Sequence, residues 1–166
     1  KEEQKKNILV LKKLMKNAHT LGIKILEIPL VDSSSMRNQK DEDEIIENLK
    51  EVTQDAKDLG ILIGLETDYK PQKILELLKK INNDNVVLNY DTGNSASLGY
   101  NSKEELTLLK KYIKNIHIKD RKLHGSTVPF GEGDVDFNLF FSTLKEIDYK
   151  GDLILQGARI DNENPE

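Results

Sequence analysis

The stretch PQKILELLKKINNDNVVLNY, residues 71–90, contains one helix followed by one strand. Apolar side chains recur at helical spacing in residues 71–81, and Pro71 suits the first turn of a helix, where a backbone N–H is not needed. Residues 85–90, NVVLNY, form a short apolar run that is typical of a strand. We therefore predict a helix over residues 71–81 and a strand over residues 85–90.

The same helix–strand unit recurs along the chain. The periodicity predicts four more helices, over residues 3–21, 41–59, 106–113 and 137–147, and four more strands, over residues 23–31, 61–66, 115–119 and 152–156. Ser102 and Glu105 have the spacing of a capping box ahead of the fourth helix. Five such units with short connections and no hairpin signal predict an α/β fold with parallel strands.

Two architectures fit five helix–strand units. One is a complete doubly wound sheet of flavodoxin-like size, and the other is part of an eight-stranded (β/α)8 barrel, whose full form takes ~250 residues. In both, ligands bind at the carboxyl ends of the strands. The side chains at the carboxyl ends of the strands must therefore be used to decide between the two architectures.

Composition limits the classes of partner. The 166 residues are 37% apolar and 33% charged, which is enough for one sizeable core, so a single domain over residues 1–166 is expected. The net charge of −4 comes from 25 basic and 29 acidic residues mixed along the chain, which argues against nucleic acid or an anionic membrane as partner. Without cysteine or an apolar run of about 20 residues, the sequence predicts a cytoplasmic protein with neither disulfides nor a membrane span.

Four successive predicted strands end in side chains that bind metal ions. These side chains are Glu66, Asp91, His117 and Gln156. An oxygen, oxygen, nitrogen, oxygen set is accepted by a divalent cation such as Mn²⁺, Mg²⁺, Co²⁺ or Zn²⁺. Each residue also has a structural interpretation, because strand-end acids often cap helices, Asp91 in DTGN fits a turn, and a histidine inside a strand is often a hydrogen-bonded core residue. The coincidence across four strands favours the metal site.

Charged and glycine-rich segments near the same strand ends have two interpretations each. Lys119, Arg121 and Arg159 favour an anionic substrate, while pairing with neighbouring aspartates is an equal alternative. The loop of residues 124–136 contains three glycines and is expected to be either a lid over the site or a long connection. The acidic run DEDE, residues 41–44, is expected to be a solvated helix face.

Five segments carry a resemblance to a known family. They are GLETD (64–68), NYDTGNSASLGY (89–100), NIHIKDR (115–121), TVPFGEGDVDF (127–137) and YKGDLILQGAR (149–159). Their D-x-G-N, H-x-K-D and V-P-x-G-E-G-x-x-D-F elements resemble the second half of the xylose isomerase-like TIM-barrel sugar phosphate isomerases and epimerases. Within that family the sequence is similar to L-ribulose-5-phosphate or L-xylulose-5-phosphate 3-epimerases and hexulose-6-phosphate isomerases.

The resemblance implies a partial TIM barrel. The five strands correspond to strands four to eight, so that the first three strands and the final helix are absent and the chain is expected to be a fragment. The resemblance also implies one divalent metal ion at Glu66, Asp91, His117 and the position of Gln156. The epimerases of the family usually place a second glutamate at that last position.

The amide at Gln156 bears on the reaction. Epimerisation needs a carboxylate on each side of the sugar, whereas Gln156 cannot accept a proton, and an aldose–ketose isomerisation needs only one base, such as Glu66. We therefore predict a metal-dependent sugar or sugar-phosphate isomerase that works through a cis-enediolate, with Glu66, Gln156 and Arg159 at the reacting sugar.

Two alternatives to this isomerase stay open. One is a 3-epimerase whose second acid is Asp120 or Glu27, and the other is a non-catalytic sugar-binding relative. Homo-oligomerisation of a full-length form is a further open question. A DNA-repair endonuclease of the same barrel class is disfavoured by the net charge of −4 and by the presence of only three histidines.

Overall fold

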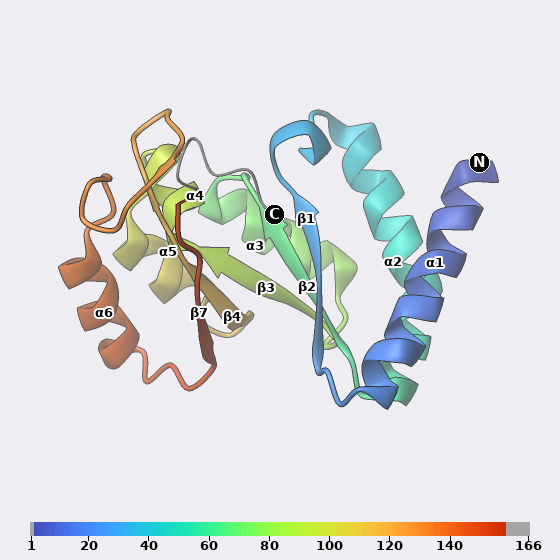
Figure 1. The fold of residues 1–166 in the computed structure, drawn as a ribbon. Helices are drawn as coiled ribbons and strands as arrows, with labels where there is room; N and C mark the ends of the chain where they lie inside the picture. Colours follow the sequence, from blue (N-terminus) through green and yellow to red (C-terminus); the bar gives the residue numbers. More distant parts are fainter. Residues whose placement is uncertain (1, 159–166) are drawn as a thin grey trace, which may run out of the picture. The chain divides into compact units, whose positions relative to one another are not determined.

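The computed structural model describes residues 2–158. Five parallel strands form one sheet, and helices connect them (Figure 1). The strands of this sheet are β1 (Ile25–Leu30), β2 (Leu62–Thr67), β3 (Val86–Asp91), β4 (Ile113–Ile118) and β7 (Asp152–Leu155). The helices are α1 (Glu2–Thr20), α2 (Gln39–Leu59), α3 (Pro71–Ile81), α4 (Thr92–Ser97), α5 (Ser102–Leu109) and α6 (Phe137–Glu146), with a short 3₁₀ helix, η1, at Asp32–Ser34.

The strand order separates the two architectures that the sequence allowed. The sheet runs β1-β2-β3-β4-β7, so each strand lies beside its neighbour in the sequence. A doubly wound sheet reverses its order at a switch point, whereas a TIM barrel adds strands in sequence order. The prediction of a partial barrel is therefore confirmed, and the flavodoxin-like alternative is wrong.

The chain divides into two compact units, Lys1–Leu88 and Asn89–Glu166, and the division falls within β3. Whether residues 1–166 act as one domain stays a prediction. Among residues 2–158, no helix has both the length and the apolar character that a membrane span requires.

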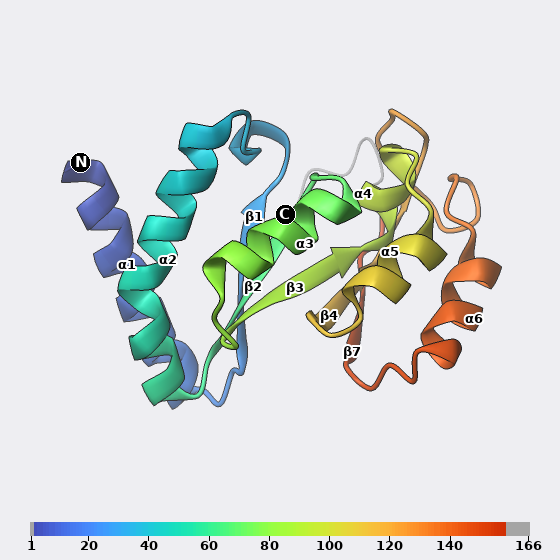
Figure 2. The same ribbon diagram turned by 180° about the vertical axis from the view of Figure 1, so that it is seen from behind.

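In the first unit, α1 and α2 lie side by side (Figures 1 and 2), and α2 also packs against α3 and β2. The side chain of Asn38 caps α2 by accepting a hydrogen bond from the Asp41 N–H, and Gly60 ends the helix in the left-handed conformation that glycine adopts readily. The apolar face of α2 buries Leu49, Val52 and Ala56. The Asn38 cap, the buried apolar face and the glycine at the end of the helix explain why the helix predicted over residues 41–59 forms.

The expectation of a solvated acidic face at residues 41–44 is wrong for Glu42. Its carboxylate is 1% exposed and lies 2.7 Å from Lys73 Nζ and 2.5 Å from Lys80 Nζ. Burial alone would raise the pKa of Glu42, but hydrogen bonds from these two lysines hold that pKa at about 2. The three side chains therefore form an ion cluster that ties α2 to α3.

The second unit contains two elements that periodicity missed. The DTGN segment, for which a turn was one of two interpretations, opens the short helix α4, and Asp91 caps it. The stretch after β4 forms a small antiparallel pair between β5 (Asp120–Arg121) and β6 (Thr127–Val128), although no hairpin was expected. Both elements are made of polar or small residues, so they carry no apolar pattern.

The start and end of α5 also differ from the prediction. Asn101, and not Ser102, caps the helix by accepting a hydrogen bond from the Glu104 N–H. The helix ends at Leu109, whereas residues 106–113 were expected to be helical, and Ile113 already begins β4. Glu105 is 3% exposed, so it packs into the interior and does not form a capping box.

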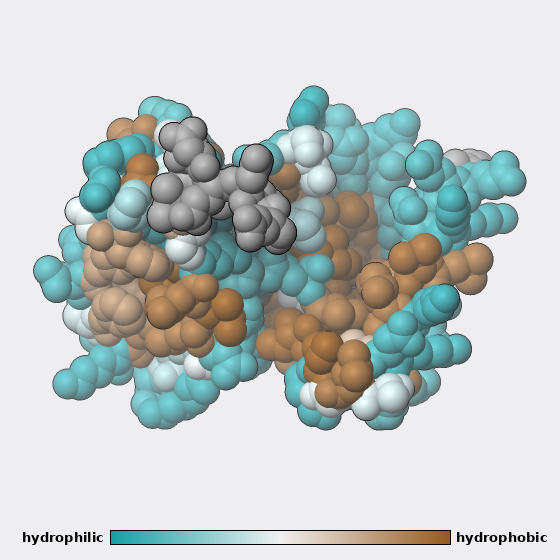
Figure 3. Space-filling view, in the orientation of Figure 1, coloured by the Kyte–Doolittle hydropathy of each residue, from teal (hydrophilic) through white to brown (hydrophobic). Residues whose placement is uncertain are grey.

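Exposed apolar side chains occur on the surface of each unit (Figure 3). In the first unit they include Leu14 and Leu21 of the α1 region, and in the second unit Ile154 and Leu155 of β7. β1 and β7 are the two edges of the sheet order. The exposed apolar side chains of β7 thus lie on an edge strand, which is typical of a sheet that is not closed into a barrel.

Candidate functional site

The second unit brings three of the predicted metal ligands together. The amide nitrogen of Gln156 lies 3.0 Å from His117 Nδ1, and Asp91 Oδ2 lies 3.9 Å from the same nitrogen. These three residues stand at the carboxyl ends of β7, β4 and β3. The backbone N–H of Gln156 donates to the carbonyl of Ile118, which places Gln156 beside β4 just after β7 ends.

Asp91 is oriented by the helix that it caps. Its Oδ1 accepts a hydrogen bond of 2.8 Å from the Asn94 N–H. This bond turns Oδ2 toward His117 and toward Lys119, whose Nζ lies 2.9 Å away. The turn formers in DTGN thus serve the site, because the helix start holds one carboxylate oxygen and leaves the other facing the cluster.

Two amide side chains lie beside one nitrogen of the His117 ring. Asn89 Nδ2 lies 3.2 Å from His117 Nδ1, while Asn89 Oδ1 accepts a hydrogen bond from Asn115 Nδ2. The Gln156 amide lies beside the same nitrogen, so Nδ1 is the ring nitrogen that faces the cluster. A lone pair on Nδ1 is what a metal ligand needs.

The donor types in this cluster suit a divalent cation. Asp91 Oδ2 and His117 Nδ1, two atoms that can bind a metal ion, lie 3.9 Å apart. Ligands about 2.0–2.2 Å from a shared ion are spaced on this scale. Asp91 and His117 are buried, so the site is protected from bulk water.

The first unit presents two acids on its strands, Glu66 near the end of β2 and Glu27 in the middle of β1. Glu66 of β2 is buried, Glu27 of β1 is exposed, and a carboxylate oxygen of each lies within 4.8 Å of the other. Ser35, after η1, donates a hydrogen bond of 2.5 Å to Asp68 Oδ2 and so connects the end of β1 to the end of β2. This unit therefore supplies Glu66, the predicted base, and Glu27, a candidate second acid.

Asp120 is committed to the backbone of the loop that follows it. Its carboxylate accepts hydrogen bonds from the N–H groups of Gly131, Gly133 and Val135 at 2.8, 2.9 and 3.3 Å. A Cβ at Gly133 would lie 1.9 Å from Asp120 Oδ1, so the close approach requires glycine. Asp120 is 1% exposed and is not placed to take a proton from a substrate.

Arg121 is likewise committed to structure. Its guanidinium donates to the carbonyl of Gly125 through Nε and Nη2, and to Asn94 Oδ1 through Nη1 at 2.8 Å. The partners are a carbonyl and an amide, and not the aspartates that the sequence suggested. Arg121 thus connects the loop to α4 and is not a free cation for an anionic substrate.

The loop of residues 124–136 is held in place at several points. Besides the bonds to Asp120 and Arg121, Asp134 Oδ2 accepts a hydrogen bond of 2.7 Å from the Leu123 N–H. These hydrogen bonds hold the loop in one position, so they favour a fixed connection over a mobile lid. Arg159, which was expected to contact the substrate, lies outside the described residues 2–158, so its role stays a prediction.

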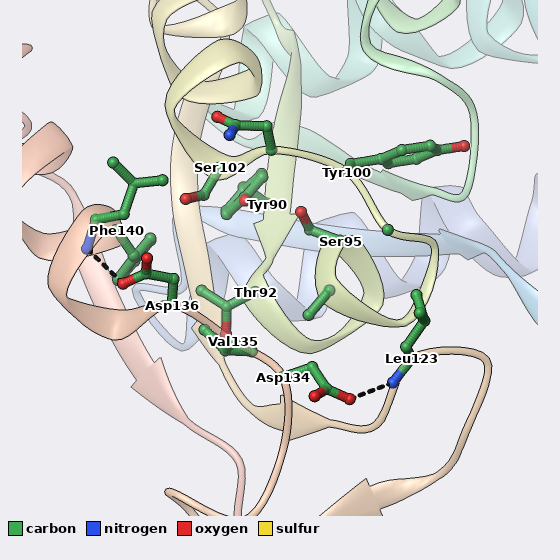
Figure 4. Close-up of a pocket in the computed structure, with 14 residues that line it drawn as sticks. Tyr90, Thr92, Ser95, Tyr100, Ser102, Leu123, Asp134, Val135, Asp136 and Phe140 are labelled. Atoms are coloured by element: carbon green, nitrogen blue, oxygen red, sulfur yellow. Dashed lines mark hydrogen bonds between the residues drawn. The ribbon is translucent and has the colours of Figure 1, made fainter.

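A pocket of about 340 Å³ lies on the opposite side of β3, where Tyr90 points (Figure 4). Beneath it, Glu105 accepts hydrogen bonds from the Tyr90 hydroxyl at 3.0 Å and from the Ser95 hydroxyl. Burial raises the pKa of Glu105 to about 7. Glu105 therefore holds the residues on both sides of Asp91 in place. The sequence did not predict this role, because the segment KEELTLL around Glu105 resembles an ordinary exposed helix.

Comparisons with known proteins agree with this architecture. Residues 1–165 match the family model of the xylose isomerase-like TIM barrel. The L-ribulose-5-phosphate 3-epimerase UlaE of Salmonella paratyphi A is 28% identical over 163 residues, which cover 94% of this chain and 57% of that protein. The chain thus spans little more than half the length of this relative.

Two solved structures are similar in fold. The D-allulose 3-epimerase from Methylomonas sp. in complex with D-allulose has a TM-score of 0.77 at 22% identity and is matched over 90% of this chain and 55% of that one. The IOLI protein with a binding zinc atom has a TM-score of 0.76 at 26% identity, over 93% of this chain and 62% of that one. With the family model matched over almost the whole length, the chain belongs to the xylose isomerase-like TIM barrel family.

Proposed function

We propose that this chain carries the metal site of a sugar or sugar-phosphate isomerase, with a divalent ion held by Glu66, Asp91, His117 and Gln156. The observation that carries the proposal is the cluster of Asp91, His117 and Gln156 in the second unit, in which Asp91 and His117 are buried. β2, which bears Glu66, precedes β3 in the sheet order, and neighbouring parallel strands end at one edge. Family membership supports the same assignment.

Each residue has a separate role in the proposed reaction. A bound divalent ion would stabilise the negative charge that develops on the carbonyl oxygen of the sugar. Glu66 removes the proton from the carbon next to the carbonyl and returns it to the former carbonyl carbon on the same face, through a cis-enediolate, while the hydroxyl proton passes from one of the two sugar oxygens to the other. Asp91 and His117 would hold the ion, and after rotation of its amide Gln156 would offer Oε1 as a neutral ligand.

The amide at position 156 favours isomerisation over epimerisation, because only one base is then available on the strands from β2 to β7. A 3-epimerase is the second candidate, and one observation favours it: Glu27 lies close to Glu66 in the first unit. Asp120 does not serve as its second acid, because three backbone N–H groups occupy the carboxylate. A sugar-binding relative without turnover is the third candidate. A cytoplasmic location belongs to the proposal as well.

Deuterium exchange tests this proposal. The chain is supplied with Mn²⁺ in heavy water, together with a panel of pentuloses, hexuloses and their phosphates, and deuterium incorporation next to the carbonyl is measured by NMR. Glu66→Gln is expected to lower incorporation by about 10²- to 10⁴-fold, the usual contribution of a general base. Glu47→Gln, on the exposed face of α2, is the matched control and should leave incorporation unchanged.

The outcomes separate the three candidates. Metal-dependent incorporation without inversion at C3 supports the isomerase, and inversion at C3 supports the epimerase. Sugar binding without incorporation supports the non-catalytic relative. Incorporation that survives both chelation and Glu66→Gln contradicts the proposed site.

A further inference from the structure

Lys119 places a positive charge directly beside a proposed metal ligand. Its Nζ lies 2.9 Å from Asp91 Oδ2, and its side chain is only 17% exposed. Lys119 stands two residues after His117, so the alternation of an extended chain directs both side chains to the same face. The ammonium group therefore belongs to the same cluster as Asp91 and His117.

The surrounding residues fix Lys119 in this position. The Thr92 hydroxyl donates to the Lys119 carbonyl at 2.7 Å and accepts from the Lys119 N–H at 2.9 Å. A Cβ at Gly93 would lie 3.0 Å from Lys119 Cγ, so the missing side chain of Gly93 makes room for the lysine stem. Two consecutive residues of α4 thus hold the backbone and the side chain of Lys119.

The charges of Asp91 and Lys119 balance each other without a metal ion. Gln156 is neutral, and a histidine that binds a metal ion is neutral as well. A dication added to this group, with Glu66 as the only other ligand charge, leaves a formal excess of one positive charge. A carboxylate in place of Gln156 would remove that excess, so Lys119 and Gln156 act in the same direction and favour an anion at the site.

We propose that Lys119 binds the oxyanion that develops on the sugar, an inference that rests on the proposed function. An ammonium group has three N–H donors, and one directed at Asp91 leaves two for substrate oxygens. Arg121 does not compete for this role, because Gly125 and Asn94 occupy its guanidinium. The ligand class that Lys119 favours is a sugar oxygen that carries negative charge, as in an enediolate.

Oxalate is the probe for this inference, because its adjacent oxygens reproduce the geometry and charge of an enediolate. Calorimetry first measures Mn²⁺ binding to the chain and to Lys119→Met, and then oxalate binding to each Mn²⁺-loaded protein. We expect Lys119→Met to bind Mn²⁺ at least as tightly as the original chain, because a competing cation is gone from Asp91. Its oxalate affinity should fall by about tenfold or more, on the scale of one charged donor lost from an oxyanion site.

Two further variants complete the experiment. Lys122→Met removes an exposed lysine three residues away and should change neither affinity. Lys119→Arg keeps the charge and should retain most of the oxalate affinity. If Lys119→Met binds oxalate within twofold of the original chain, or loses Mn²⁺ binding, the inference is wrong. If the original chain itself binds no Mn²⁺, the proposed metal site is wrong, and the two failures are thus distinguished.

Discussion

The amide nitrogen of Gln156 lies 3.0 Å from Nδ1 of His117 and so occupies the position from which a fourth ligand would reach the proposed metal site. In the epimerases that the family resemblance implies, a glutamate is usual at this position. A side chain that cannot accept a proton therefore stands where a second base would act. The side chain at position 156 therefore bears on the choice between an isomerase and an epimerase.

Gln156→Glu should therefore introduce epimerisation. The new carboxylate would supply the second base that epimerisation needs, and it would also add one negative charge to the proposed ligands, so Mn²⁺ should bind more tightly. NMR of the sugar products detects inversion at C3. Gln72→Glu, at an exposed position of α3, is the control. If the product distribution does not change, Gln156 has a structural role and does not determine the reaction.

Glu105→Leu should weaken both stability and metal binding. The substitution leaves the hydroxyls of Tyr90 and Ser95 without their buried acceptor, which costs about 1–3 kcal/mol in the free energy of unfolding. Because these residues flank Asp91, Mn²⁺ affinity should fall as well. Denaturant unfolding and calorimetry measure the two effects, with the exposed Glu104→Leu as control. A loss of stability with unchanged Mn²⁺ affinity would contradict the link to Asp91.

Glu105 should also make stability depend on pH. Its pKa is raised to about 7 in the folded chain from 4.5, so the folded state retains a proton that the unfolded state has lost between these values. The stabilisation is present below pH 4.5 and is lost as the pH rises toward about 7. Glu105→Gln should flatten this slope in a series of unfolding curves. A slope that persists in the variant would assign the dependence to another group.

Glu42 should produce the opposite dependence at acid pH. Lys73 and Lys80 lower its pKa to about 2 from 4.5, so the unfolded state takes up a proton first as the pH falls. The contribution of Glu42 is present above pH 4.5 and is lost as the pH falls toward about 2. Glu42→Gln should be less stable than the original chain at pH 7 and should approach it near pH 2. Glu44→Gln, an exposed neighbour, should be equal to the original chain throughout.

Asp120→Ala should release the loop without abolishing metal binding. The N–H groups of Gly131, Gly133 and Val135 lose their acceptor, so their hydrogen exchange should accelerate. Mn²⁺ affinity should change little, because the carboxylate is not a ligand. Asp84→Ala, at an exposed position, is the control. Unchanged exchange at these three amides would show that the loop is held by other contacts.

The sequence predicted the elements that have an apolar pattern. The helix over residues 71–81 is confirmed as α3, and the neighbouring strand over residues 85–90 is β3 with one further residue. In α4, by contrast, TGNSAS has no apolar period, and the helix depends on the Asp91 cap and on contacts with Lys119 that only the fold creates. Short polar elements of this kind are not visible to periodicity.

The proposed metal ligands have a clearer signal in the sequence than the residues that support them. Asp91 and His117 stand at strand ends, a position that marks ligand sites in any parallel α/β fold. Glu105 and Glu42 lie within ordinary charged helix sequences, and their burial results from packing against partners that are distant in sequence, such as Lys80 for Glu42. Asp120 and Arg121 looked like site residues for the same reason as Asp91, but the loop that follows them uses their side chains.

The proposed metal site depends most directly on Nδ1 of His117 as a ligand. A ¹⁵N-detected correlation spectrum of the imidazole rings of all three histidines, recorded during titration with Zn²⁺, tests this role. We expect a large change of the His117 Nδ1 shift that saturates at one equivalent, while His19 and His124 do not respond. An Nδ1 shift of His117 that stays constant while Zn²⁺ binds elsewhere, or does not bind, would contradict it.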